Sequence, residues 1–227
     1  EEGVKKFVLT SSVAAIIYGH EKVSFNEEDW TDTDAEGCSA YNKSKTYAEK
    51  AAWDFINSDE CNMELSVINP SLVLGPVLES DFGTSVELVK RFLNGGFPLA
   101  PNISFGIVDV RDVAQLHLLA LESPQASGNR FIASSETLAI PLISEFLRKK
   151  IPEYQKRLPK GTAPDFLIKL LGFFSPLMKT VANQLGKTKE LDNSKAKNVL
   201  GWQPRSVEEA VIASAKSLIE FDIVKSP

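Results

Sequence analysis

The chain has 227 residues, of which 43% are hydrophobic and 24% are charged, and its formal net charge is −5. This length and composition predict a globular protein with one sizeable core, or one domain with a satellite lobe. The acidic balance and the lack of a basic run argue against nucleic acid or an anionic membrane as the main partner. The cysteines, Cys38 and Cys61, form neither a CxxC motif nor a disulfide pattern, so we expect a reducing compartment, the cytoplasm. With His20 and His117 as the only histidines, we expect no metal site.

The first part of the chain alternates apolar runs with polar loops and one helical pattern. The run KFVLTSS is apolar and then small and polar, which is typical of a central parallel strand whose end opens onto a site. The stretch that follows the polar loop contains good helix formers and packing residues. In chain order we expect a strand at 6–12, a polar loop at 19–40, a helix at 40–57, a strand at 63–70 and a loop at 71–76.

The second part repeats the alternation of helix and strand. We expect helices at 84–94, 110–123 and 140–151, and strands at 105–110 and 129–135. The tail helix begins at Ser206, with Glu209 three residues later in capping-box spacing. Strands that alternate with helices predict an α/β fold with a doubly wound parallel sheet.

The most apolar stretch is FLIKLLGFFSPLM at 166–178, which is interrupted by Lys169, Gly172 and Pro176. A membrane-spanning helix needs roughly 18 or more consecutive apolar residues. We therefore interpret this stretch as a buried or lobe-packing helix rather than a membrane helix.

The helix expected at 40–57 carries a tyrosine and a lysine in a spacing that suits proton transfer. Tyr41 and Lys45 are four residues apart, so on a helix their side chains face the same side. A free tyrosine titrates near ~10, too high for an efficient acid at neutral pH, and a cation held close to a phenol lowers its pKa. The spacing Tyr-x-x-x-Lys also arises by chance, so the pair alone does not establish a function.

The strand at 6–12 ends in two serines, either of which is a candidate partner for that pair. A serine hydroxyl aimed at the same point would hold a substrate carbonyl oxygen by a hydrogen bond. Because side chains alternate along a strand, only one of Ser11 and Ser12 points to the required face. The alternative is that both serines have only a structural role, at the end of the strand or as the cap of a helix.

The order of the motifs along the chain resembles the extended short-chain dehydrogenase/reductase family, also called the NAD-dependent epimerase/dehydratase superfamily. The motifs are TSS, then YNKSKTYAEKAAWDF, INPSLVLGP, VDVRDVAQLHL and KAKNVLGWQP. The AEKAAW continuation is similar to the branch of dihydroflavonol reductase, cinnamoyl-CoA reductase and yeast methylglyoxal reductase. The resemblance covers nearly the whole chain and implies a Rossmann-type sheet with a smaller substrate-binding lobe.

The resemblance implies reduction of a ketone or aldehyde with hydride from NADPH, NADH remaining open. Tyr41 would donate the proton, Lys45 would tune Tyr41 and bind the nicotinamide ribose, and Ser12 would hold the substrate oxygen, with Ser11 as the fallback. Tyr41, Lys45, Pro70, Val73, Leu74, Gly75, Pro76 and Ser85 are the residues that the resemblance implies for cofactor binding.

The family's glycine fingerprint, G-x-x-G-x-x-G after a first strand, does not occur among the 13 glycines. These glycines let the backbone approach the cofactor's pyrophosphate at a helix N-terminus. The resemblance therefore implies a fragment, the C-terminal two-thirds of the fold. We expect residues 1–76 and 105–135 to form a partial dinucleotide-binding domain, with 77–104 and 136–227 as the substrate lobe. We also expect this chain alone neither to bind NADPH tightly nor to reduce a carbonyl.

Two other functions stay open. The first is a nucleotide-sugar epimerase or dehydratase, or a 3β-hydroxysteroid dehydrogenase, in place of a carbonyl reductase. The second is a truncated, non-catalytic binding protein in which the Tyr–Lys pair is a relic. The expected partner is a small-molecule carbonyl or alcohol, and a homodimer is an open alternative to a monomer.

Overall fold

The computed structural model describes residues 3–58 and 61–227. They form two compact units. Among the described residues, unit 1 comprises 3–58, 61–71, 111–135 and 189–204, and unit 2 comprises 72–110, 136–188 and 205–227. Residues 72–76 and 105–110, which we expected in the cofactor-binding domain, thus pack within unit 2, and the assignment of a cofactor domain and a substrate lobe stays a prediction.

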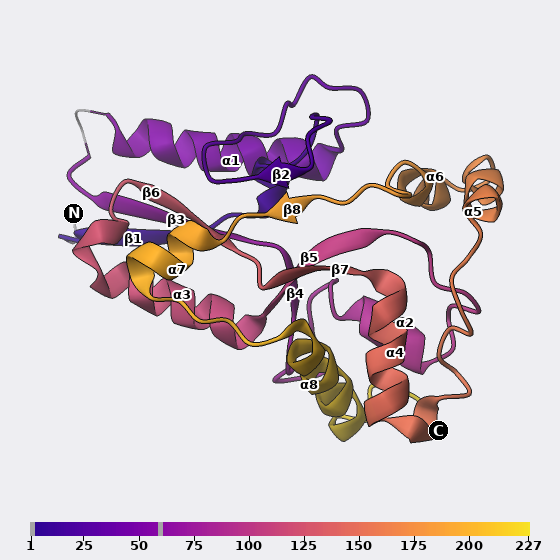
Figure 1. Cartoon of the computed structure of the whole chain (residues 1–227). Helices are drawn as coiled ribbons and strands as arrows, with labels where there is room; N and C mark the ends of the chain where they lie inside the picture. The colour runs from indigo at the N-terminus through magenta and orange to yellow at the C-terminus, as the bar shows by residue number, and fades with distance from the viewer. Residues whose placement is uncertain (1–2, 59–60) are drawn as a thin grey trace. The chain divides into compact units, whose positions relative to one another are not determined.

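Unit 1 is built around a three-stranded parallel sheet in the order β1-β3-β6. Its strands are β1 (Lys6–Thr10), β3 (Glu64–Pro70) and β6 (Asn129–Ala133). The central strand, β3, is buried from Leu65 onward, as expected for a parallel strand covered on both faces. In Figure 1, α1 (Ala40–Ile56) lies on one side of this sheet, and α3 (Val110–Glu122) and α7 (Ser194–Leu200) lie on the other.

The remaining elements of unit 1 are short. The 3₁₀ helices η1 (Val13–Ala15) and η2 (Pro124–Ala126) follow β1 and α3. A two-stranded parallel sheet joins β2 (Ser24–Phe25) to β8 (Glu190–Leu191). Phe25 packs with Ile16, Ile17 and Ile132 in a small core that fixes the segment after β1.

Unit 2 has a mixed three-stranded sheet in the order β4-β5-β7. The strand β4 (Leu72–Leu74) runs parallel to β5 (Ser104–Asp109), and β7 (Glu136–Ala139) runs antiparallel to β5. Its helices are α2 (Glu87–Leu93), α4 (Ile140–Lys150), η3 (Pro152–Tyr154), α5 (Asp165–Gly172), α6 (Pro176–Ala182) and α8 (Val207–Glu220). The helices α2, α4 and α8 share one apolar core with the sheet, whereas α5 packs mainly on α6.

The predicted α/β fold with a parallel sheet is confirmed. Three local predictions are wrong, the third of them only in part. The expected loop at 71–76 contains the strand β4, because its backbone finds a partner in β5, far along the chain. The expected helix at 166–178 is two helices, because Ser175 caps α6 and Pro176 begins it. The prediction that this stretch is buried is also wrong in part, since Phe173 and Phe174 are 85% and 82% exposed.

Within the described residues, every helix is too short or too polar to cross a membrane.

Candidate active site

Helix α1 presents the tyrosine and lysine of the predicted pair at its first turns. The Ser39 hydroxyl accepts a hydrogen bond from the Asn42 backbone N–H at 3.2 Å, which fixes where the helix begins. Tyr41 is 58% exposed, so its phenol is open to solvent or to a ligand. The Lys45 ammonium lies 6.0 Å from the centre of the Tyr41 ring. The structure thus brings Tyr41 and Lys45 together, as the four-residue spacing predicts.

The two serines after β1 have different environments. The Ser11 side chain is buried, and its hydroxyl donates a hydrogen bond to the Glu49 carboxylate. The Ser12 hydroxyl oxygen accepts a hydrogen bond from the Ala14 backbone N–H at 3.1 Å, and Ser12 thereby caps η1. A hydroxyl that accepts a bond in this way still has its own proton to donate. Ser12 therefore suits a bond to a substrate oxygen better than Ser11, and η1 packs against α1, which carries Tyr41.

Tyr18 is a neighbour of this site that sequence reasoning missed. Burial raises the pKa of the Tyr18 phenol, and the nearby Tyr41 and Cys38 side chains raise it further. The Lys189 ammonium lies 4.4 Å from the centre of the Tyr18 ring. Tyr18 therefore stays protonated at neutral pH beside Tyr41. It lies in no recognisable motif, so only the fold reveals its position.

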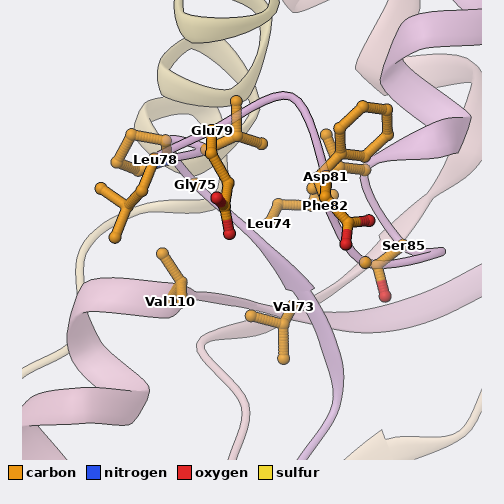
Figure 2. A pocket seen from close by; sticks show the side chains of 13 residues that line it. Val73, Leu74, Gly75, Leu78, Glu79, Asp81, Phe82, Ser85 and Val110 are labelled. Carbon is orange, nitrogen blue, oxygen red and sulfur yellow. The ribbon is translucent and has the colours of Figure 1, made fainter.

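In unit 1, Pro70 is the last residue of the buried strand β3. Tyr41 and Lys45 also lie in unit 1. The remaining residues predicted to bind a cofactor, Val73, Leu74, Gly75, Pro76 and Ser85, lie in unit 2 and line one pocket of about 380 Å³. Figure 2 shows the side chains of Glu79 and Asp81 around the same pocket, with Val110 on another side. The structure therefore groups the predicted VLGP residues with Ser85.

The backbone of the VLGP turn is held by helix α8. The Gly75 N–H donates a hydrogen bond to the Ser214 hydroxyl at 2.7 Å, and that hydroxyl donates to the Gly75 carbonyl at 2.8 Å. The Val77 N–H donates to the Ser217 hydroxyl at 2.9 Å. Both serines are buried, so these bonds fix the shape of the pocket wall.

A second, larger pocket of about 610 Å³ also lies within unit 2. Its wall is mostly apolar and includes Phe97, Phe105 and Leu167. The two charged side chains that line it, Glu87 and Arg91, form an ion pair with each other at 3.3 Å. Such a cavity suits a ligand with a hydrocarbon part.

The sequence profile of the NAD dependent epimerase/dehydratase family matches residues 1–133, which is more than half of the chain. The chain belongs to this family. The predicted resemblance to the extended short-chain dehydrogenase/reductases is thus confirmed, including the branch of the cinnamoyl-CoA and methylglyoxal reductases.

Among curated relatives, the chain is similar to reductases of this family. The NADPH-dependent methylglyoxal reductase of Saccharomyces cerevisiae is 32% identical over 97% of this chain and 65% of its own length. A ketoreductase of Aspergillus niger is 34% identical over 96% of this chain and 63% of its own length. Cinnamoyl-CoA reductase 1 of Arabidopsis thaliana is 32% identical over 97% of this chain and 59% of its own length. The chain thus spans less than two thirds of each of these relatives.

A solved structure agrees with this family membership. The crystal structure of yeast methylglyoxal/isovaleraldehyde reductase complexed with NADPH has a TM-score of 0.77 and 30% sequence identity, covering 96% of this chain and 65% of that chain.

Proposed function

We propose that the protein is an NADPH-dependent reductase of small aldehydes or ketones, with Tyr41, Lys45 and Ser12 as its catalytic residues. The observation that carries the proposal is the exposed Tyr41 phenol with the Lys45 ammonium over its ring. The relatives named as NADPH-dependent or carbonyl-reducing enzymes support the choice of reaction and cofactor.

In this proposal each residue has one task. Tyr41 gives a proton to the substrate oxygen as that oxygen gains negative charge. Lys45 stabilises the phenolate that remains, since an ammonium near a phenolate lowers its energy. Ser12 donates a hydrogen bond to the same oxygen and so stabilises the developing charge.

The residues present fit the nicotinamide ribose end of the cofactor. Lys45 has no carboxylate partner among the described ion pairs, so its ammonium can bind the ribose hydroxyls. Pro70, Val73 to Pro76 and Ser85 stay the residues that the family resemblance implies for contact with the cofactor. When bound, NADPH supplies the hydride.

Unit 2 by itself contains the apolar pocket of about 610 Å³, which suits a ligand with a hydrocarbon group. A nucleotide-sugar substrate would need charged or polar partners for its phosphates. The Glu87–Arg91 pair leaves this pocket without an unpaired charge among its lining residues. An epimerase or dehydratase function is therefore less well supported than reduction.

The test is a substrate screen on the longest natural form of the protein. NADPH and NADH consumption is measured with a panel of small aliphatic and aromatic aldehydes and ketones. We expect NADPH oxidation with several of the carbonyl compounds and a weaker rate with NADH. Failure to oxidise either cofactor with every compound, or conversion of a UDP-sugar in its place, would contradict the proposal.

A further inference from the structure

A buried ionic cluster in unit 1 joins the elements that carry the three proposed catalytic residues. We call Ser11, Glu49, Asn69 and Arg130 the Glu49 cluster. Each member comes from a different element: Ser11 follows β1, Glu49 lies on α1, Asn69 on β3 and Arg130 on β6. The exposed fraction of Glu49 is 0%, although its neighbour Lys50 is exposed. A buried carboxylate of this kind is rare unless it is fully paired.

Three donors, on β3, on β6 and at the residue directly after β1, converge on the Glu49 carboxylate. The Arg130 guanidinium donates to Glu49 Oε1 at 2.6 Å, in a buried ion pair. On the other oxygen, Asn69 Nδ2 donates to Glu49 Oε2 at 2.7 Å, and the Ser11 hydroxyl donates to the same atom. Helix α1 is therefore fixed to all three strands of the parallel sheet through one side chain.

The cluster reaches the backbone of the proposed catalytic serine. Asn69 Nδ2 also donates to the Ser12 carbonyl at 3.2 Å, and Asn69 Oδ1 accepts no hydrogen bond from the described residues. The two bonds from Nδ2 thus set the orientation of the Asn69 amide. A change at Glu49 removes one of them and frees the amide to rotate away from Ser12.

Arg130 extends the cluster into the loop before α1. Its Nη1 donates to the Glu27 carbonyl at 2.8 Å and to the Asp29 carbonyl at 2.7 Å. Its guanidinium lies 3.9 Å from the centre of the Trp30 ring. The planar guanidinium of Arg130 donates to several acceptors and stacks on the Trp30 ring at the same time, which a lysine ammonium cannot do.

The spacing of residues along α1 connects this cluster to Tyr41, the proposed proton donor. Glu49 lies one turn after Lys45 and two turns after Tyr41, so the three residues lie along one side of α1. The buried end of that side is fixed by the cluster, while the other end carries the exposed phenol. We propose that Glu49 and Arg130 are positioning residues that fix the Tyr41–Lys45 helix and the Ser12 backbone relative to each other.

This inference rests on the proposed reductase function for its catalytic consequence. A buried ion pair adds little net stability compared with an apolar replacement, because its desolvation offsets its attraction. Its directional bonds instead select one arrangement of α1 and the strand ends. A small misplacement of a proton donor lowers the rate of the chemical step far more than it weakens binding.

The first part of the test is kinetic, on the longest natural form of the protein. Glu49→Gln keeps the size of the side chain but replaces one acceptor oxygen by a donor, and Glu64→Gln is the matched control at an exposed position of β3. We expect Glu49→Gln to lower kcat about tenfold or more while KM for NADPH changes less than about threefold. Glu64→Gln keeps both constants. A variant whose rate falls only in proportion to its unfolded fraction would overturn the positioning role.

The second part is hydrogen exchange on this chain, which does not depend on activity. We expect Glu49→Gln to speed exchange at residues 11–16 and 41–46 compared with Glu64→Gln. If Glu49→Gln does not fold, Arg130→Lys takes its place in both measurements, because it retains the charge and loses the planar guanidinium. If the wild type reduces no carbonyl, the proposed function fails and exchange alone decides the positioning role. Unchanged exchange in both segments overturns it.

Discussion

Gly75 has a backbone conformation that other residues rarely adopt. Its φ is 118°, and a Cβ at this position would lie 2.9 Å from both the Asp109 carboxylate and a Val110 methyl group. Gly75→Ala is therefore expected to destabilise the protein by about 1–3 kcal/mol, from backbone strain and the close contact. Urea unfolding monitored by circular dichroism measures the change. Gly128→Ala is the control, since Gly128 also has a positive φ, of 74°, but no atom within 4 Å of the added Cβ. A loss no larger than the control's would show that the close contact is relieved without cost.

Glu27 gives the stability a predictable pH dependence. Burial raises the pKa of its carboxyl, partly offset by a hydrogen bond from the Ile132 backbone N–H. Because the folded-state pKa is raised, the stability from Glu27 is complete below the unfolded-state pKa and is lost as the pH rises through the folded-state pKa. Glu27→Gln removes this loss and is expected to gain stability relative to wild type between about pH 4 and pH 7. Urea denaturation of both proteins at both pH values measures this difference in stability. Glu28→Gln, at the exposed neighbouring residue, is the control. A relative stability that falls as the pH rises would contradict the sign.

At the scale of elements, helix α8 determines the shape of the VLGP turn through two buried serines. Ser214→Ala leaves the Gly75 N–H without its partner and is expected to cost about 1–3 kcal/mol. Crystallography of the variant is expected to show a displaced turn at residues 74–77. Lys216→Ala, at an exposed position of the same helix, is the control. A variant with an unchanged turn and unchanged stability would mean that Ser214 does not hold it.

Helices with clear local signals were predicted well from the sequence. The helix expected at 40–57 is α1 (Ala40–Ile56), and Ser206 caps α8 as the capping-box spacing predicts. The strands β4 and β7 were not predicted. They are short, and they exist because of pairing with β5 rather than because of local propensity.

The candidate site can be predicted only in part from the sequence. The spacing along one helix places Tyr41 beside Lys45, and the structure has them together. The choice between Ser11 and Ser12 needed the structure, because it depends on Glu49, which is 38 positions from Ser11 in the chain. Tyr18 and Arg130 likewise reach their neighbours only through tertiary packing.

For the whole molecule, the sequence lacks the glycine fingerprint that holds a dinucleotide pyrophosphate. We therefore expect the 227-residue chain by itself to bind NADPH more weakly than micromolar. Titration calorimetry measures this, with the yeast methylglyoxal reductase, which has been crystallised with NADPH, as the positive control. Micromolar binding by the chain would show that the residues present here hold the cofactor without that fingerprint.

Tyr41 is proposed to be the proton donor of a carbonyl reductase. The most direct measurement is the NADPH-dependent reduction rate of Tyr41→Phe in the longest natural form of the protein. Tyr47→Phe is the matched control, because Tyr47 is an exposed tyrosine on the same helix. We expect a loss of about a hundredfold or more in kcat for Tyr41→Phe and a rate close to wild type for Tyr47→Phe. A Tyr41→Phe variant that retains most of the wild-type rate would contradict it.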